Sequence, residues 1–319
     1  MKKLICTTLL VETSPQGIPL GAACIASAIK NSQLTKGKYD VELVDFSLEE
    51  PEIVLARQNG GERAVSSFIA QKIAAEKVDF ACFSVYVWNR NILTQAAFEL
   101  KKFLPECVCI AGGPEVTAAP TSFGNAFDFT TAGQGELATV QLLSEIEKGI
   151  ERKEISNDIS GIYIPENSSE NPDSDSENRG ENSYSDGKKS SFGGESSESS
   201  KIKRAVPCPV ETCPSPYLDG TIDPSKYGGA LWELARGCPF KCSYCYESKG
   251  EKRIAYFPME RLEKEIELFA RKNIPQVFVL DPTYNASKAR AIKMLRLIEK
   301  KTPGTFYYFE ARAEFIDRE

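Results

Sequence analysis

The sequence of 319 residues contains no histidine. Histidine is the usual base of Ser-His-Asp and Cys-His catalysis and a common ligand of zinc, haem iron and corrin cobalt. Its absence excludes these mechanisms and every histidine-ligated metal from this chain. Acid–base work would depend on Asp, Glu, Lys, Tyr or Cys side chains.

Long apolar runs and an excess of basic residues are also lacking. No stretch reaches the roughly 18 uncharged apolar residues of a membrane-spanning helix. The apolar N-terminal run ends near Val11, before Glu12 and Pro15, which favours a first strand over a signal peptide. A net charge of -6 argues against a surface that binds nucleic acid by charge. We therefore expect a cytoplasmic protein with no membrane or nucleic-acid partner, in which the ten cysteines are buried, catalytic or metal-binding thiols.

Residues 1–150 alternate short apolar strands with helical patterns. The predicted strands are Leu4–Val11, Val41–Phe46, Val78–Val87, Val108–Ala111 and Phe127–Thr131. The predicted helices are Leu20–Lys30, Ala64–Ala75, Ile92–Phe103 and Glu136–Lys148. Such alternation is typical of a parallel sheet covered on both faces. We predict an α/β, doubly wound, flavodoxin-like domain whose ligand lies beyond the carboxyl ends of the strands.

A connector over residues 151–225 separates this domain from the rest. After a short strand, Gly161–Pro165, it contains the segment Glu166–Ser200, with 12 Ser, nine acidic residues and only two aromatic residues. Such a composition buries too little apolar surface to offset the entropy of ordering. We predict a disordered acidic insertion, followed by a Pro-rich stretch that contains Cys208 and Cys213.

Residues 226–319 begin a second βα pattern. Its predicted strands are Leu231–Arg236, Gln276–Leu280 and Thr305–Ala311, and its predicted helices are Met259–Lys272 and Ala286–Lys301. The string RGCPFKCSYCYES follows the first strand and places Cys238, Cys242 and Cys245 in a C-x3-C-x2-C array. Three thiolates on one loop can bind an iron–sulfur cube and leave one iron open. The alternatives are zinc, with a fourth ligand from Cys208 or Cys213, a disulfide, or plain buried thiols.

The cysteine array resembles that of the radical S-adenosylmethionine (SAM) superfamily, including the aromatic Tyr244 before the last cysteine. The resemblance implies a [4Fe-4S] cluster on Cys238, Cys242 and Cys245 and SAM bound at the carboxyl rim of a parallel βα barrel. It implies SAM contacts from four residues, Tyr244, Asp281, Glu310 and Arg312. The Gly-Gly-Glu that many members use for the SAM amino group is missing, so Asp281 is a substitute, and Glu310 and Arg312 have a surface ion pair as their alternative.

The N-terminal domain resembles the cobalamin-binding domain of the cobalamin-dependent radical SAM group. The resemblance rests on SPQGIPLG after the first strand, GGPEVT after the fourth, GQGE after the fifth and the connector PSPYLDG. It implies cobalamin contacts from Ser14, Gly17, Ser84, Tyr86, Trp88, Gly112, Gly113, Glu115, Gly133, Gly135 and Glu136. GGPE and GQGE are also ordinary tight turns, and Trp88 is also typical of a core or an interface. Cys6, Cys24, Cys82, Cys107 and Cys109 are expected to be small buried hydrophobic residues.

The resemblance implies an enzyme that cleaves SAM reductively, for methyl transfer or radical rearrangement of an unknown substrate, with a flavodoxin or ferredoxin as electron donor. Three strands after residue 226 are fewer than the superfamily's barrel uses, so we expect a partial barrel that is incomplete at its C-terminus. Two alternatives remain: a truncated, inactive fragment that binds cobalamin and the cluster, and a zinc-stabilised interaction protein.

Overall fold

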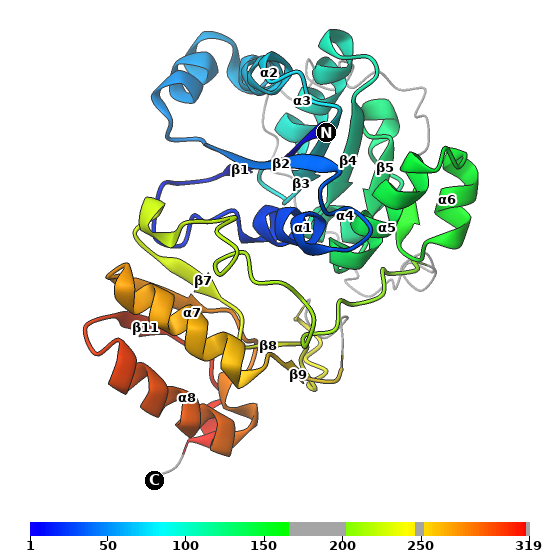
Figure 1. Ribbon diagram of the computed structural model, residues 1–319. Coiled ribbons are helices and arrows are strands. Elements are labelled where there is room, and N and C mark those ends of the chain that lie inside the picture. The colour runs from blue at the N-terminus through cyan, green and yellow to red at the C-terminus, as the bar shows by residue number, and fades with distance from the viewer. Residues whose placement is uncertain (166–201, 246–251, 317–319) are drawn as a thin grey trace, which may run out of the picture.

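The computed structural model describes residues 1–165, 202–245 and 252–316. The predicted disordered insertion, Glu166–Ser200, lies outside these residues. Two sheets with their helices form an upper and a lower unit, joined by the chain after residue 202 (Figure 1). No helix in the described ranges combines the length and the apolar character that crossing a membrane requires.

The upper unit contains a six-stranded sheet in the order β2-β1-β3-β4-β5-β6. Its strands are β1 (Lys2–Leu10), β2 (Tyr39–Ser47), β3 (Phe80–Ser84), β4 (Val108–Gly112), β5 (Phe129–Thr131) and β6 (Ile162–Tyr163). Strands β1 to β5 are parallel, and β6 is antiparallel to β5. The first five strands have the predicted flavodoxin-like order, and β6 coincides with the short strand predicted at Gly161–Pro165.

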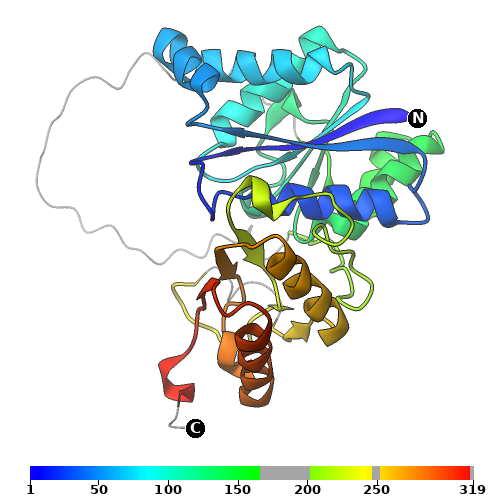
Figure 2. The same cartoon turned by 60° about the vertical axis from the view of Figure 1, so that its left-hand side comes forward.

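Helices cover both faces of this sheet, as its continuous apolar strands require. They are α1 (Leu20–Asn31), α2 (Pro51–Ala75), α3 (Arg90–Phe103), α4 (Pro114–Ala118), α5 (Gly135–Glu147) and α6 (Arg152–Asp158). Figure 2 shows α2 and α3 on one face and α1 with α5 on the other. Ile5 and Phe83 pack under α2 and α3, whereas Leu4 and Phe80 pack under α1 and α5, because neighbouring strand residues point to opposite faces.

Helix α2 is longer than the sequence predicts, since it begins at Pro51 rather than at Ala64. Pro51 suits a first helical turn. The helix is broken at Gly60 and Gly61, and of its first ten residues only Ile53 is buried. The spacing of apolar residues does not predict this first half of α2, because the segment has no apolar face.

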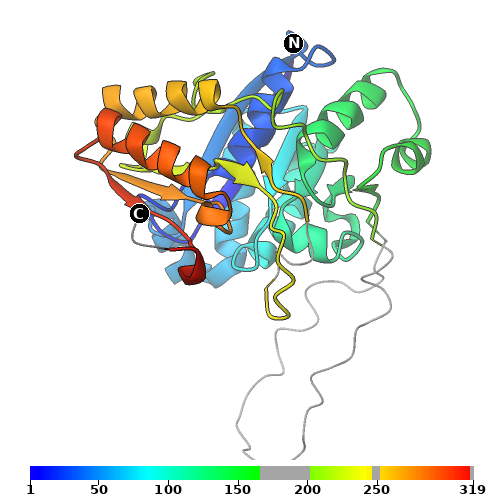
Figure 3. The ribbon, with the colours of Figure 1, turned by 90° about the horizontal axis from the view of Figure 1, so that it is seen from below.

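The lower unit is a small parallel sheet in the order β11-β10-β7. Its elements, with a separate two-stranded antiparallel pair β8-β9, are β7 (Ala230–Trp232), β8 (Ala235–Arg236), β9 (Ala255–Tyr256), α7 (Met259–Arg271), β10 (Gln276–Val279), α8 (Lys288–Lys301) and β11 (Phe306–Tyr308). The described residues also form the single-turn helices η1 (Gly124–Ala126), η3 (Pro224–Lys226), η5 (Tyr284–Ala286) and η6 (Ala313–Phe315). Figure 3 shows α7 and α8 side by side over this sheet.

The predicted single strand Leu231–Arg236 is wrong, because the chain divides it into β7 and β8. The break falls at Glu233 and Leu234. There the amides of Leu234 and Ala235 donate to the Asp281 carboxylate at 2.7 and 3.0 Å, instead of to a neighbouring strand. This turn directs the chain from the sheet toward Cys238.

The core of the lower unit also contacts the upper one. Trp232, Phe257, Phe269 and Met294 share one apolar cluster with Ile18, which lies just before α1. The opposite face of the small sheet is open: Phe278 stacks on Tyr308 at 4.4 Å between ring centroids, and Tyr308 is 46% exposed. Among the described residues β11 pairs only with β10, so it is the edge strand that the sequence predicts.

Candidate functional site

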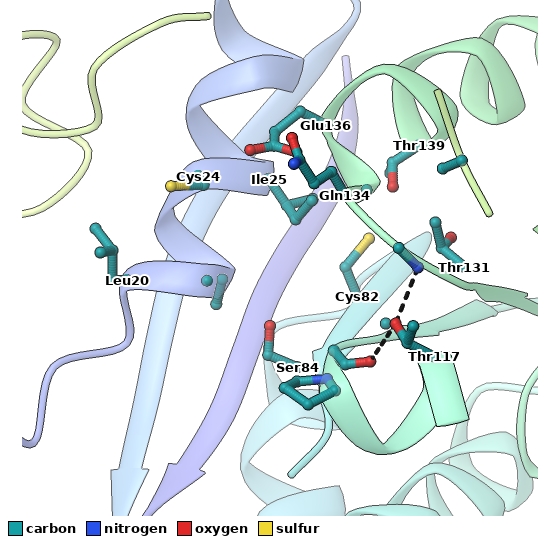
Figure 4. A pocket seen from close by; sticks show the side chains of 18 of the residues that line it. Leu20, Cys24, Ile25, Cys82, Ser84, Thr117, Thr131, Gln134, Glu136 and Thr139 are labelled. Atoms are coloured by element: carbon teal, nitrogen blue, oxygen red, sulfur yellow. Dashed lines mark hydrogen bonds between the residues drawn. The ribbon is translucent and has the colours of Figure 1, made fainter. Parts of the chain in front are cut away.

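A cavity of about 500 Å³ lies at the carboxyl edge of the upper sheet. The strand ends of β3, β4 and β5 line it, together with the first turns of α1 and α5. Figure 4 shows Leu20, Cys24 and Ile25 on α1 at one side and Thr131, Gln134 and Glu136 at the other. Lower-unit residues complete the lining, namely Leu231, Glu233, Ala235, Arg236, Gly237, Leu280 and Pro282. The cavity therefore lies between the two units, where a doubly wound sheet binds its ligand.

Glycines keep this cavity open where strands turn into helices. Gly113 has φ +111°, and a Cβ there would lie 2.5 Å from the Val85 carbonyl oxygen. A Cβ on Gly135 would lie 3.0 Å from the Ile25 Cδ1 atom. Side chains at these two positions would shift the turn after β4 or fill the gap between α5 and α1.

The strand ends also carry hydroxyl groups. The Thr117 hydroxyl accepts from the Gly133 amide and donates to the Gly113 carbonyl, both at 2.9 Å (Figure 4), which ties the two glycine turns together. The Thr131 hydroxyl is buried and has no hydrogen-bond partner among the described residues. Because a buried polar atom without a partner costs free energy, a polar ligand group in the cavity would stabilise this site.

A buried ionic cluster forms the seam between the units. Arg236 pairs with Glu136 at 2.7 Å and with Glu233 at 2.9 Å, and it donates to the Gln134 side-chain oxygen at 3.0 Å. Burial alone would lower the pKa of Arg236, but the charges of Glu233 and Glu136 outweigh it and raise that pKa. Arg236 therefore stays charged beside the cavity.

The loop with the three predicted cluster ligands follows directly. Cys238 is buried, with its Sγ atom 4.0 Å from the Thr283 hydroxyl, while Cys242 and Cys245 are half-buried and joined by a turn. Within the described ranges, no three Cys, Asp or Glu side chains form a group that could hold a metal ion. The donor set itself, three thiols on one short loop, fits an iron–sulfur cluster in composition. Their role as cluster ligands remains a prediction.

The predicted SAM-binding residues occupy different environments. Asp281 is buried, and this burial raises its pKa to about 6. Its Oδ1 atom holds the turn before the cysteine loop, as described above. Tyr244 is 91% exposed. The Arg312 guanidinium lies 4.0 Å from the Phe240 ring centroid, pairs with Glu314 and lies within hydrogen-bond reach of the Cys242 thiol.

Glu310 is exposed, and its carbonyl oxygen accepts from the Tyr284 amide at 2.8 Å. The structure thus brings Arg312 to the cysteine loop and pairs it with Glu314, not with Glu310. SAM binding by Tyr244, Asp281, Glu310 and Arg312 remains a prediction.

Seven of the predicted cobalamin-binding residues line the cavity: Ser84, Tyr86, Gly112, Gly113, Gly133, Gly135 and Glu136. The other four lie outside the lining. Trp88 stacks on Tyr86 at 4.6 Å and donates to the Leu9 carbonyl, so it supports a cavity residue from behind. Glu115 pairs with Arg90 at 2.6 Å, and the Ser14 hydroxyl accepts from the Gly17 amide at 3.1 Å within a tight turn.

Sequence reasoning missed several residues of the cavity and its seam. They include Cys24, Ile25, Thr131, Gln134, Glu233 and the ion pair of Arg236. Arg236 is recognisable from its place before Cys238, but its partner Glu136 is distant in sequence and belongs to another motif. The remaining missed residues come together only in the folded chain, so no local sequence pattern identifies them.

The remaining thiols are not arranged as ligands. Cys208 donates to Cys213, which raises the pKa of Cys208 and lowers that of Cys213. Both belong to the core around Trp232. The expected burial is found for Cys6, Cys82, Cys107 and Cys109, whereas Cys24 is only half-buried, and Cys6, Cys24 and Cys82 also line the cavity.

Comparison with known proteins gives a family match over the lower unit. Residues 232–319 match the radical SAM superfamily. The chain is 30% identical over 218 residues to the cobalamin-dependent radical SAM methyltransferase TokK of Streptomyces tokunonensis, a match that covers 65% of this chain and 28% of TokK. Residues 232–319 thus match the radical SAM superfamily, and the chain is similar to a cobalamin-dependent radical SAM methyltransferase, which confirms the predicted resemblance.

Solved structures show the same fold over nearly the whole chain. The radical SAM methyltransferase TsrM of Kitasatospora setae, solved with cobalamin and a [4Fe-4S] cluster bound, matches with a TM-score of 0.57 at 15% identity over 94% of this chain and 51% of TsrM. The cobalamin-dependent SAM radical enzyme OxsB matches with a TM-score of 0.61 at 17% identity over 98% of this chain and 39% of OxsB. The chain therefore spans about half of these proteins or less.

Proposed function

We propose that this chain is the cofactor-binding part of a cobalamin-dependent radical SAM enzyme, with methyl transfer as its reaction. One observation supports it above the others: the cavity at the carboxyl edge of the upper sheet shares a wall with the strand that leads into the cysteine loop. Two cofactors bound in these places would lie close to one another, on either side of Arg236.

The chain offers residues suited to each cofactor. The glycine turns at Gly112–Gly113 and Gly133–Gly135 leave space for a flat corrin, and the Thr131 hydroxyl could bond one of its polar groups. Cys238, Cys242 and Cys245 would bind a [4Fe-4S] cluster through three irons and leave the fourth for SAM. When bound, the cluster and SAM supply reductive cleavage of a carbon–sulfur bond, and cobalamin supplies a methyl carrier.

The protein itself orients and shields these groups. Tyr86 is half-buried, lines the cavity and is backed by Trp88, so its ring would lie beside a bound corrin. The chain has no histidine to offer the cobalt, and the groups that line this edge of the sheet include the Cys82 thiol, the Thr131 hydroxyl and the Tyr86 ring. The residues from 226 onward would form part of the SAM-binding barrel, and a reduced flavodoxin or ferredoxin would deliver the electron.

The cluster is tested by anaerobic reconstitution of the full chain with iron and sulfide. We expect iron and sulfide to bind in equal amounts with broad thiolate-to-iron absorption, and Ala substitution of Cys238, Cys242 or Cys245 to abolish it. Cys208→Ala and Cys213→Ala are matched controls, because these two free thiols are hydrogen-bonded to each other in the core rather than lying on the cysteine loop. Zinc in place of iron, or an unchanged cluster in the triple Ala variant, would contradict the proposal.

Cobalamin binding is tested by titrating the full chain with hydroxocobalamin and following the shift in its visible spectrum. Gly135→Val should weaken binding at least about tenfold, because the new side chain enters the space between Ile25 and Thr131. Gly304→Val is the control, since no atom lies within 4 Å of a Cβ at that position. If a doubly loaded chain binds both cofactors and never cleaves SAM, the enzymatic part of the proposal is wrong and only cofactor binding remains.

A further inference from the structure

Arg236 connects two loops that are far apart in sequence. It is the last residue of β8, two residues before Cys238, and its guanidinium reaches the turn that begins α5. There it bonds to Glu136 at 2.7 Å and to Gln134 at 3.0 Å. The side chains of Arg236 and Glu136 are only 11% and 6% exposed, so solvent screens this contact little.

Both ends of the contact are held by other bonds. On one side, β8 pairs with β9, and the Arg236 guanidinium also pairs with Glu233 and lies 5.4 Å from the Phe257 ring centroid. On the other side, the turn before α5 is tied by the bond from the Gly133 amide to Thr117. A buried pair between two anchored ends can fix their relative position, whereas a pair between mobile side chains cannot.

Among the residues that the structure describes, no other ion pair is both buried and shared between the two units. Arg261 and Glu265 are also buried, at 16% and 1% exposure, but both lie on α7, one helical turn apart. Lys226 and Asp45 connect the two units, but Lys226 is 66% exposed. Since burial of charges costs about as much as the pair returns, Arg236 and Glu136 contribute more to a defined arrangement than to net stability.

We propose that Arg236 is a positioning residue. Its pair with Glu136 holds the cysteine loop at a fixed place relative to the glycine turn before α5, where cobalamin is proposed to bind. The inference rests on the proposed function only for the identity of the two cofactors, because the coupling of the two loops is a property of the protein without them. A lysine would replace Arg236 poorly, because an ammonium group cannot contact Glu136, Glu233 and Gln134 with the fixed geometry of a guanidinium.

The first test uses hydrogen exchange of the protein without cofactors. Arg236→Gln and Glu136→Gln should each increase exchange at least about tenfold in two separate segments, residues 134–137 and 237–245, because loss of the pair frees both. The double variant should add little to either single change, since both remove the same contact. Arg261→Gln is the matched control and should leave both segments unchanged. Faster exchange in one segment alone, or additive effects, would overturn the inference.

The second test measures position in the loaded protein. With cob(II)alamin and the reduced cluster bound, the magnetic coupling between the two paramagnetic centres reports their separation by electron paramagnetic resonance. Compared at equal occupancy of both cofactors, Arg236→Gln should broaden or weaken this coupling, with partial recovery in Arg236→Lys. Unchanged coupling in Arg236→Gln would overturn the inference. If the unaltered chain binds neither cofactor, the proposed function fails, and the exchange experiment still decides the coupling of the loops.

Discussion

Asp281 shows how one carboxylate can join separate parts of the lower unit. It follows β10, and it accepts two backbone hydrogen bonds from the turn between β7 and β8. Burial raises its pKa to about 6 against an ordinary 3.8, although these two bonds oppose the rise. The folded chain therefore binds a proton at Asp281 more tightly than the unfolded chain does.

This shift predicts a specific pH dependence. As pH rises from about 4 to about 6, the unfolded Asp281 ionises first, so the free energy of unfolding should fall by about 3 kcal/mol and then level off. Asp281→Asn keeps a side-chain oxygen for the two amides and removes the charge, so this part of the decrease should vanish. The difference between the two proteins in urea unfolding from pH 4 to pH 7 is the measurement. Parallel curves for the two proteins would show that Asp281 titrates normally.

Gly113 gives a second prediction at this scale. Its φ of +111° and the close Val85 carbonyl both oppose a side chain, so Gly113→Ala should lower the free energy of unfolding by about 3 kcal/mol or more. Gly37 also has a positive φ, +76°, but no atom lies within 4 Å of a Cβ there. Gly37→Ala should therefore cost only about 1 to 2 kcal/mol. Equal losses in thermal or urea unfolding would mean that the Val85 contact is not limiting.

Motif residues could be predicted from the sequence where their role depends on the backbone. Glycines after strand ends mark places where a parallel sheet turns toward its ligand, and those at Gly112–Gly113 and Gly133–Gly135 do line the cavity. Ser14, Glu115 and Trp88 could not be placed in the same way, because their side chains have local partners that a motif does not reveal.

At the scale of elements, the sequence predicts strands well where both faces are buried. Strands β1 and β3 are buried over almost their whole length, and their apolar runs identify them. The β7–β8 break was not predictable, because it depends on bonds to Asp281, some 47 residues away. The prediction also misses exposed helix segments such as the first half of α2, because they lack the apolar stripe by which a helix is recognised in a sequence.

The side chain of Asn285 joins the loop after β10 to the loop after β11. The Asn285 side chain donates to the Arg312 carbonyl at 2.8 Å and accepts from the Arg312 amide at 2.9 Å. Asn285→Ala removes both bonds and should cost about 1 to 2 kcal/mol of unfolding free energy, with faster amide exchange over residues 310–314. Asn285→Asp keeps the acceptor and should lose less. No change in exchange near Arg312 would mean that other contacts hold this loop.

At the scale of the whole molecule, the two units are joined by contacts that no local pattern reveals. Asp219, in the connector, accepts hydrogen bonds from Ser27 and Asn31 on α1 at 2.5 and 2.7 Å. A Cβ on Gly229 would lie 2.6 Å from Pro15. The predicted carboxyl-edge site could be inferred from topology alone, but its second wall depends on this packing of the lower unit against α1.

The flanks of the Ser-rich acidic segment come together in the fold. The Tyr163 hydroxyl donates to the Lys203 carbonyl at 2.9 Å, the Ser160 hydroxyl donates to the Arg204 carbonyl at 2.9 Å, and the Ala205 amide donates to the Ala132 carbonyl at 2.7 Å. The chain thus leaves and re-enters the upper unit at one place, beside β5 and β6. Residues 166–200 are not needed to span a distance between the two units.

Replacing residues 166–200 with a short Gly-Ser linker should therefore leave the fold and the cavity intact. Shortening a loop of this kind changes its closure entropy by only about 1 kcal/mol, and in the stabilising direction. We expect an equal or slightly higher unfolding midpoint and an unchanged hydroxocobalamin affinity. A control that keeps the segment but changes Ala205 to Pro removes the bond to Ala132, which ties the returning chain to the end of β5 at the cavity, and should weaken binding. Loss of cobalamin affinity in the shortened chain would instead assign the acidic segment a direct part in the site.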